Sequence, residues 1–277
     1  MDQKKKLIKL ALFGSPLKSS LSPLIHPMFA RQFGLGCEYQ CIETDIDGFP
    51  ERLETFRLEG GSGCNITLPL KGAAWQLAAG ATSETNRAQA ANTLVHKSSK
   101  GWFAHNTDGA GLVRDLVGNH GIDLAGKRVM VLGAGGAAAG ILGNLQAGGP
   151  REIILVNRDI ERARALAERL GSGGKVAVGN WADLSEQGRF DLVVNATSLG
   201  HLGQAPLLKE TLFAADGLCY DLNYHTASEP LRNLCENIGQ RYIDGLGMLV
   251  EQAAESFYVW TGKRPDASAA MKTCALV

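Results

Sequence analysis

Short apolar runs alternate with longer amphipathic stretches over residues 7–105. Apolar runs of about four to eight residues that end at glycine, proline or polar residues indicate buried strands, and the longer stretches indicate helices. The pattern predicts strands at 7–13, 38–42, 63–67, 92–97 and 101–105, and helices at 23–33 and 49–58. Because strands separated by helices form βαβ units, we expect a mostly parallel sheet.

A second series of the same kind begins near Arg128. It predicts strands at 129–132, 152–156, 190–195 and 217–222, and helices at 136–146 and 160–170. The chain is therefore expected to be an α/β protein of two domains. The first domain covers residues 1–109 and the second, a doubly wound sheet, covers residues 110–244, with the join near 108–112.

Residues 245–277 are expected to be helical. Apolar residues step by four, three, four and three positions and give one stripe on a helix, made of Leu246, Val250, Ala253, Phe257 and Trp260. We expect this helix to pack back on the first domain. Gln252 lies off the stripe, where its side chain is available to a binding site.

Composition and charge fit a globular protein that acts on a small molecule. The chain has 277 residues, of which 45% are hydrophobic and 20% charged, and Lys plus Arg (28) equals Asp plus Glu (28). A net charge of zero does not favour binding to nucleic acid or to an anionic membrane. Residues 129–150 carry no charge, but their glycines are better explained by a strand, a tight turn and a helix than by a membrane span.

Six cysteines are present without a C-x-x-C pair or zinc spacing. This usage predicts a reducing cytoplasm, no disulfide framework and no metal site.

A dinucleotide-binding motif follows the predicted strand 129–132. Gly133-Ala134-Gly135-Gly136-Ala137-Ala138 has the form G-x-G-x-x-G/A and opens a helix. The first glycine allows the tight turn, the second lets backbone approach a pyrophosphate, and the third small residue lets helix pack on strand. The N–H groups of the helix start then face the anion. The second domain is thus predicted to be Rossmann-like.

The residues after the next strand favour NADP over NAD. An NAD enzyme usually places Asp or Glu there to bind the ribose 2′-OH, whereas this chain has Asn157 and Arg158. Arg158 suits a 2′-phosphate, and Arg162 faces the same way if a helix starts near Asp159. Asp159 is the contrary feature, because its carboxylate repels that phosphate or bonds a bare ribose.

Polar residues gather near strand ends of the first domain. They are Ser20, Ser22, Asn65, Thr67, Lys71, Asn92 and Asp108. Each alone has a structural explanation, such as a helix start at Ser22 or a helix cap at Asp108. Together they bring hydroxyls, amides, a cation and a carboxylate to one side of a parallel sheet, where ligands usually bind.

These motifs resemble the shikimate dehydrogenase family from about residue 8 to about residue 265. The resemblance is carried, in the family's order, by Ser20–Pro23, Asn65–Lys71, Ala91–Leu94, Asn106–Gly109, Gly133–Ala138, Asn157-Arg158, Asn195–Ser198 and Asp244–Val250. It implies a substrate domain and an NADP domain with a cleft between them, and reversible reduction of 3-dehydroshikimate to shikimate within aromatic amino-acid biosynthesis.

The resemblance also implies roles for single residues. Lys71 and Asp108 would be the catalytic pair. The implied substrate residues are Ser20, Ser22, Thr67, Asn92, Tyr224 and Gln252. The implied coenzyme residues are Gly133, Ala134, Gly135, Gly136, Ala137, Asn157, Arg158, Arg162, Thr197, Leu222 and Gly245. The expected partner is the small-molecule substrate alone, and a homodimer is left open.

Three positions depart from the family pattern. Ser19 stands where the family often has His, Asn223 where it often has a bulky residue, and Asp159 where Thr or Ser is common. The first two bear on the substrate preference and the third on the coenzyme preference.

Lys71 is expected to handle a proton. Negative charge builds on the substrate oxygen during reduction, and a nearby ammonium stabilises it and supplies a proton. Asp108 would be coupled to Lys71, so their titrations belong to the pair. The competing explanation is a surface salt bridge between the two.

Two other functions compete with an NADP-dependent shikimate dehydrogenase. One is a quinate/shikimate dehydrogenase of broader substrate or NAD use. The other is a non-catalytic sensor of NADP and a metabolite, against which the presence of both Lys71 and Asp108 argues.

Overall fold

The computed structural model describes residues 7–170, 176–182 and 184–277. The chain forms two compact units. Residues through Gly111, together with Val250–Val277, make the first unit, and Leu112–Leu249 make the second.

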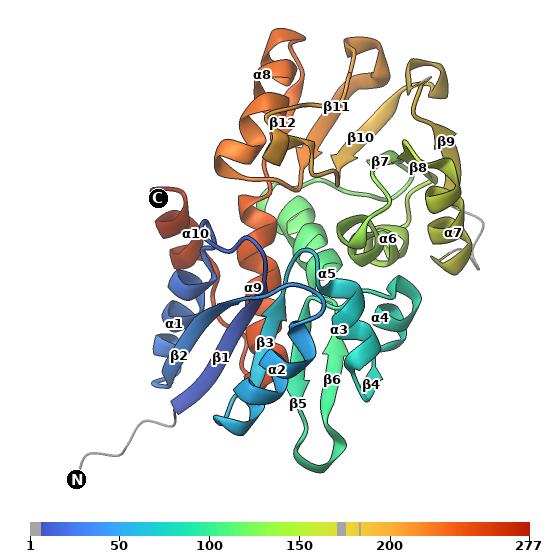
Figure 1. The fold of residues 1–277 in the computed structure, drawn as a ribbon. Coiled ribbons are helices and arrows are strands. Elements are labelled where there is room, and N and C mark those ends of the chain that lie inside the picture. The colour runs from blue at the N-terminus through green and yellow to red at the C-terminus, as the bar shows by residue number, and fades with distance from the viewer. Residues whose placement is uncertain (1–6, 171–175, 183) are drawn as a thin grey trace. The chain divides into compact units, whose positions relative to one another are not determined.

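The sheet of the first unit has the strand order β2-β1-β3-β5-β6-β4 (Figure 1). The strands are β1 (Leu7–Gly14), β2 (Gly36–Glu43), β3 (Gly63–Ile66), β4 (Gly80–Ala81), β5 (Thr93–His96) and β6 (Trp102–His105). β1 pairs in parallel with β2 and β3, whereas β5 runs antiparallel to β3 and β6. The five strands expected in this region are confirmed, and β4 was not predicted because a strand of two residues has no period to read.

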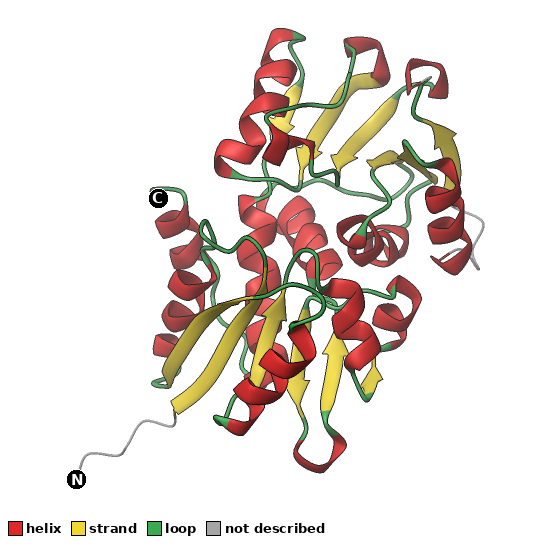
Figure 2. Cartoon of the chain, viewed as in Figure 1, coloured by secondary structure: helices red, strands yellow, loops and turns green. Residues whose placement is uncertain are grey.

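Helices line the sheet of the first unit (Figure 2). They are α1 (Ser22–Gln32), α2 (Phe49–Leu58), α3 (Lys71–Leu77), α4 (Ser83–Ala88), α10 (Ser268–Cys274), the start of α5 (Asp108–Arg114) and most of α9 (Leu246–Thr261). Residues 112–114 of α5 and 246–249 of α9 belong to the second unit. α5 continues into one turn of π-helix, Asp115–Asn119.

A buried aromatic cluster fixes α2 to the sheet of the first unit. Phe13 of β1 meets Phe49 and Phe56 of α2 edge to face, with ring centroids 5.5 and 5.8 Å apart. Leu70, the N-cap residue of α3, and Ala74 within the helix extend the same core. The helix that carries Lys71 at its start is therefore anchored by its apolar side.

The predicted stripe of α9 does pack. Val250, Ala253 and Phe257 are buried, and the Trp260 indole donates a hydrogen bond to the Leu94 carbonyl at 2.9 Å. Trp260 also lies over Gly63, where an added Cβ would come within 2.4 Å of the indole. This contact holds α9 against β3 and β5, and so places the other face of the helix near the strand ends.

The sheet of the second unit is entirely parallel, in the order β12-β11-β10-β7-β8-β9. The strands are β7 (Arg128–Leu132), β8 (Glu152–Asn157), β9 (Val176–Asn180), β10 (Phe190–Asn195), β11 (Phe213–Asp221) and β12 (Arg241–Ile243), and the helices are α6 (Gly136–Ala147), α7 (Ile160–Leu170) and α8 (Glu229–Asn237). A parallel sheet is buried on both faces, and strands β7, β8 and β10 are accordingly apolar almost throughout.

One strand boundary of the second unit was wrong. The strand predicted at 217–222 begins at Phe213 and ends at Asp221. The charged Asp216 and the following Gly217 interrupt the apolar run, so the first half of the strand is hard to recognise in the sequence. The pairing with β10 also shifts register between Phe190 and Leu192.

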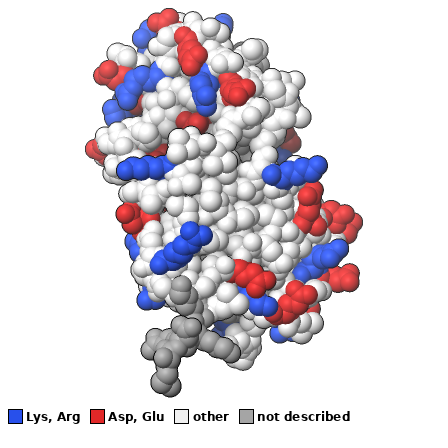
Figure 3. Space-filling view, turned by 90° about the vertical axis from the view of Figure 1, so that its left-hand side faces the viewer, with Lys and Arg blue, Asp and Glu red and all other residues white. Residues whose placement is uncertain are grey.

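The segment 129–150 forms β7, a turn and α6. Among the described residues, none of the helices has both the length and the apolar character needed to cross a bilayer. On the face drawn in Figure 3, basic and acidic side chains of the described residues are interspersed.

Candidate active site

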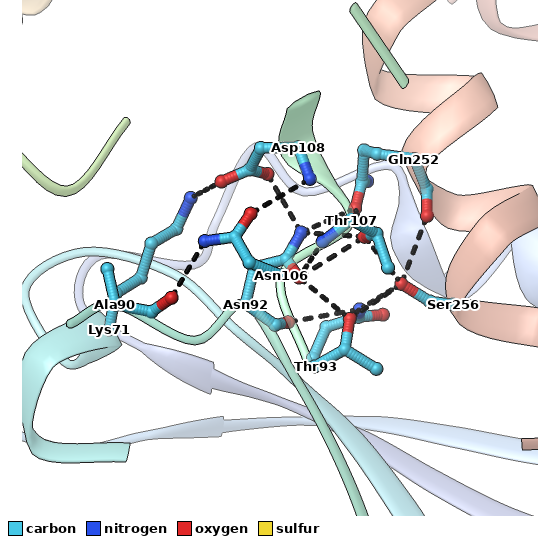
Figure 4. Close-up of polar contacts among 10 residues, drawn as sticks. Lys71, Ala90, Asn92, Thr93, Asn106, Thr107, Asp108, Gln252 and Ser256 are labelled. Carbon is cyan, nitrogen blue, oxygen red and sulfur yellow. Dashed lines mark hydrogen bonds and ion pairs between the residues drawn. The ribbon is translucent and has the colours of Figure 1, made fainter. Parts of the chain in front are cut away.

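Lys71 and Asp108 meet beyond the carboxyl ends of β3 and β6, two strands that run in the same direction. Lys71 is the first residue of α3 and Asp108 the first of α5. The Lys71 ammonium lies 2.6 Å from Oδ2 of Asp108, and the two side chains are 14% and 8% exposed (Figure 4). The start of a helix is the less favourable end for a cation, so the contact with Asp108 is the main local stabilisation of Lys71.

Asn92 orients the carboxylate from the other side. Its Nδ2 donates to Oδ1 of Asp108 and to Oγ1 of Thr107, both at 2.8 Å. Its Oδ1 accepts from the Thr107 amide at 2.8 Å. Both oxygens of Asp108 are thereby held, one by Asn92 and one by Lys71.

Gln252 and Ser256 bring α9 into the same network. Asn92 Nδ2 also lies 3.2 Å from Oε1 of Gln252. The amide group has two hydrogens, so its three acceptors compete for them. The Ser256 hydroxyl contacts Thr93 at 2.7 Å and Thr107 at 3.1 Å. Gln252 makes the longest of the three Asn92 contacts, so it is the member most easily released to a ligand.

Ser256 was missed by the sequence reasoning. It follows Gln252 by four residues and so lies on the same face of α9. That spacing is visible in the sequence, but a single Ser on an apolar helix does not by itself indicate a functional residue.

Ser20 and Ser22 lie at the start of α1. The Ser22 amide donates to the Ser20 hydroxyl at 3.3 Å, and Ser22 is buried. The amides of a helix start and two hydroxyls make a site suited to an anion such as a carboxylate. Thr67 follows β3 and is half-buried.

Ser22 contacts a cluster of hydrogen-bonded side chains made of Tyr39, Asn65 and His26. Tyr39 and His26 were not predicted from the sequence. Oδ1 of Asn65 accepts from the Tyr39 hydroxyl at 2.9 Å and contacts Nε2 of His26 at 3.0 Å. Burial raises the pKa of Tyr39, a rise that the hydrogen bond with the Ser22 hydroxyl partly offsets. Burial lowers the pKa of His26 to about 3, so the ring is neutral and donates from Nε2. Tyr39 therefore links Ser22 to Asn65.

The glycine motif of the second unit forms the predicted turn between β7 and α6. Gly133 has φ +102°, and an added Cβ would lie 2.9 Å from the Ala196 carbonyl oxygen. Gly135 faces open space, since a Cβ there would meet only the Arg162 guanidinium at 3.9 Å. Ala138 is fully buried. The turn thus leaves room above Gly135, and the N–H groups of α6 border it, which fits a pyrophosphate.

The residues after β8 fit a 2′-phosphate. The Asn157 side chain accepts from the Ala134 amide at 3.2 Å and so borders the glycine turn. Arg158 is exposed, and among the described residues no carboxylate is paired with it. Asp159 accepts from the Arg162 amide at 3.2 Å, which caps α7. Arg162 Nε donates to the Ala134 carbonyl at 3.0 Å, so its guanidinium lies against the turn.

Thr197, Leu222 and Gly245 lie on segments that follow β10, β11 and β12. Thr197 donates its hydroxyl to Oδ1 of Asn195 at 2.7 Å. Gly245 approaches Leu222 so closely that a Cβ would lie 2.4 Å from the Leu222 carbonyl oxygen. Tyr224 belongs to the same unit, whereas the other five predicted substrate residues belong to the first.

Among the described residues there is no group of three or more His, Cys, Asp or Glu that could hold a metal ion.

A parallel sheet with a glycine turn, together with a second α/β unit that carries a lysine–carboxylate pair, defines a dinucleotide-dependent oxidoreductase with a separate substrate domain. Three family models match the chain. They are the shikimate dehydrogenase substrate binding domain over residues 12–94, shikimate/quinate 5-dehydrogenase over 115–210 and the shikimate 5′-dehydrogenase C-terminal domain over 245–274. The chain belongs to the shikimate dehydrogenase family.

Curated relatives match over almost the full length. The shikimate dehydrogenase (NADP(+)) of Xylella fastidiosa strain M12 is 45% identical over 261 residues, covering 93% of this chain and 92% of the relative. The protein of the same name from Alkalilimnicola ehrlichii is 42% identical and covers 94% of this chain and 96% of the relative.

Solved structures share the fold. An Ael1 enzyme from Pseudomonas putida superposes with a TM-score of 0.87 at 39% identity, covering 96% of this chain and 97% of that one. Shikimate 5-dehydrogenase from Thermus thermophilus, in complex with NADP(H) and shikimate, has a TM-score of 0.83 at 33% identity, and the match covers 97% of this chain and 99% of that one. Quinate dehydrogenase from Corynebacterium glutamicum, in complex with NAD, has a TM-score of 0.87 at 25% identity and covers 99% and 100%.

Proposed function

We propose that the chain catalyses the reversible, NADP-dependent reduction of 3-dehydroshikimate to shikimate, a step of aromatic amino-acid biosynthesis. The observation that carries the proposal is the Lys71–Asp108 pair, 2.6 Å apart and held by Asn92. A mostly buried ion pair adds little net stability to a fold, even though removal of one partner is costly, and a helix start is the less favourable end for a cation. Its chemistry is proton transfer at a substrate oxygen.

The two units divide the work in this proposal. Residues 1–109 bind the substrate, residues 110–244 bind NADP, and residues 245–277 pack on the substrate domain. The packing of α9 on β3 and β5 and the glycine turn between β7 and α6 support this division.

Lys71 is the proposed general acid. Nζ donates its proton to the oxygen on which charge builds during reduction and takes it back during oxidation. Asp108 holds the ammonium in place through their 2.6 Å contact. The coenzyme, when bound, supplies or accepts the hydride.

The remaining polar groups hold the substrate. Ser20 and Ser22, at the start of α1, are the proposed ligands of the carboxylate, and Tyr224 is proposed to contact it as well. Thr67, Asn92 and Gln252 are the proposed ligands of the ring hydroxyls. The hydrogen bond of Tyr39 with the Ser22 hydroxyl supports an orientation fixed before the substrate binds.

The proposed coenzyme contacts follow the turn and the strand ends. Gly133 to Ala137 bind the pyrophosphate, and Asn157, Arg158 and Arg162 bind the adenosine half. Thr197, Leu222 and Gly245 bind the nicotinamide half.

The proposed setting is the cytoplasm, in keeping with six cysteines that are all free. A homodimer stays a prediction, which sedimentation of the purified chain would test.

A second candidate is oxidation of quinate, or use of NAD, by the same site. Asp159 favours it, because a carboxylate beside the 2′ position suits a ribose hydroxyl better than a phosphate. The structural match to a quinate dehydrogenase bound to NAD points the same way.

Turnover of shikimate and of quinate, each with NADP⁺ and with NAD⁺, tests the proposal. We expect the highest kcat/KM for shikimate with NADP⁺. A higher kcat/KM for quinate or for NAD⁺ would select the second candidate. Binding of NADP⁺ without turnover of either substrate would indicate a sensor.

A further inference from the structure

Asn223 occupies an unusual place at the end of the second sheet. It follows β11 by two residues and is buried. The family resemblance leads one to expect a bulky side chain there, and the structure shows instead an amide that makes two hydrogen bonds.

The Asn223 side chain joins two loops. Its Nδ2 donates to Oδ1 of Asp221 at 2.8 Å and to the carbonyl oxygen of Thr197 at 3.2 Å. Its main-chain oxygen accepts from the Gly245 amide at 2.9 Å. The segments that follow β10, β11 and β12 therefore meet at this one residue.

Asp221 accepts hydrogen bonds from both Asn223 and Asn195. It is fully buried at the last position of β11, directly opposite Asn195 in the register with β10. Oδ1 of Asp221 also accepts from the Asn195 amide at 2.9 Å, and Oδ1 of Asn195 in turn accepts from the Thr197 hydroxyl at 2.7 Å. Thr197 is thus held through Asn195 from one side and through Asn223 from the other.

The segment held in this way borders the glycine turn. A Cβ at Gly133 would lie 2.9 Å from the Ala196 carbonyl oxygen and 3.3 Å from the Thr197 methyl group. A change in the position of residues 196–197 would therefore alter the wall of the turn. Ligands of parallel α/β sheets bind at these carboxyl ends of the strands.

We propose that Asn223 is a positioning residue for the coenzyme: by linking Asp221 to the Thr197 carbonyl, it sets the loops that receive the nicotinamide half of NADP. The inference rests on the proposed use of NADP. In this proposal Asn223 acts through the Thr197 carbonyl rather than through a contact of its own with the coenzyme.

Coenzyme fragments separate this role from a general loss of structure. In Asn223→Leu, which keeps the number and branching of the side-chain heavy atoms and removes both side-chain hydrogen bonds, we expect the Kd of NADP⁺ to rise by about tenfold. The Kd of 2′,5′-ADP, which lacks the nicotinamide half, should change less than about twofold, and so should the Kd of shikimate. Equal weakening of NADP⁺ and 2′,5′-ADP, or of neither, would overturn the proposal.

Two further variants keep the test decisive. Tyr242→Phe removes the contact of Asp221 Oδ2 with the Tyr242 hydroxyl, 3.3 Å away, and leaves Thr197 untouched. It should bind NADP⁺ as the unmodified chain does. Asn223→Ser, which is too short to span Asp221 and Thr197, replaces the Leu variant if that one does not fold.

The outcome is independent of the substrate. If the unmodified chain binds NADP⁺ but does not oxidise shikimate, the proposed function fails and the fragment comparison still holds. If it oxidises shikimate and Asn223→Leu binds NADP⁺ equally well, the positioning role alone is wrong.

Discussion

At the scale of single residues, the pair Lys71–Asp108 shows how neighbours define a role. The sequence offered a lysine beyond a strand and an aspartate before a helix. The structure adds that both side chains are mostly buried and that Asn92 occupies the second carboxylate oxygen. This removes the surface salt bridge as an explanation, because such pairs are exposed and contribute little.

Lys71→Met and Lys71→Arg separate charge from proton transfer. Arg keeps the cation but does not give up its proton at accessible pH. We expect both variants to lower kcat by about 10²–10⁴-fold, with a smaller change in the KM of shikimate. Urea unfolding should show that Lys71→Met lowers the free energy of unfolding by about 1–3 kcal/mol, because Asp108 loses its cation. The free energy of unfolding of Lys71→Arg should lie closer to that of the unmodified chain. A kcat near normal in Lys71→Arg would mean that positive charge alone suffices.

At the scale of elements, the start of α7 joins a stability role to a specificity role. Asp159 caps the helix through the Arg162 amide. The same carboxylate follows Arg158, the proposed ligand of the 2′-phosphate. A neutral cap would keep the first role and remove the repulsion.

Asp159→Ser should therefore raise the preference for NADP⁺ over NAD⁺ without loss of stability. Ser is as good a cap as Asp, so the midpoint of thermal unfolding should hardly change. The ratio of kcat/KM for NADP⁺ to that for NAD⁺ should rise by about three- to tenfold, the scale of one partly screened charge contact.

Asp159→Ala is the matched control for the cap. It removes the same charge and should shift the coenzyme ratio equally, but it should cost about 1 kcal/mol of stability. An unchanged ratio in both variants would place Asp159 away from the 2′ position.

At the scale of the whole molecule, the two units should respond to acid in opposite directions. Burial lowers the pKa of His26, in the first unit, to about 3. Below about pH 6.5 the unfolded chain binds a proton there that the folded chain does not, so the first unit loses stability as the pH falls.

Asp221, in the second unit, changes stability with pH in the opposite direction. Burial raises the pKa of its carboxyl to about 6, although hydrogen bonds from Asn223, Asn195 and Tyr242 oppose the rise. Between about pH 6 and pH 4 the folded chain holds a proton that the unfolded chain has lost. The contribution of Asp221 is therefore favourable to folding at low pH and is lost as the pH rises through about 6.

Hydrogen exchange resolved by residue would measure both effects. Between pH 7 and pH 5, after correction for intrinsic rates, protection should fall in residues 7–111 and 250–277 and rise in the described residues of 112–249. One proton of difference changes the folding equilibrium by about tenfold per pH unit. Asp221→Asn, which resembles the protonated side chain, should abolish the rise in the second unit only. A rise that persists in this variant would assign the effect to another group.

The sequence by itself determined the order of elements and much of the chemistry. Periodic apolar runs such as 129–132 and the stripe of α9 are local patterns, and local patterns report buried faces wherever the chain folds. The glycine turn is equally local, since Gly133 must adopt a positive φ that its position in the motif already implies.

Only the tertiary structure decided which polar side chains meet. Asn92, Asp108 and Ser256 are brought together from the start of β5, from α5 and from α9, and Asn223 joins Asp221 to Thr197 across three strand ends. A short polar side chain has the same sequence signature whether it caps a turn, faces solvent or completes a buried network. Its partner is set by the packing of distant elements, and for that reason Ser256, Tyr39 and Asn223 acquired their roles only in the folded chain.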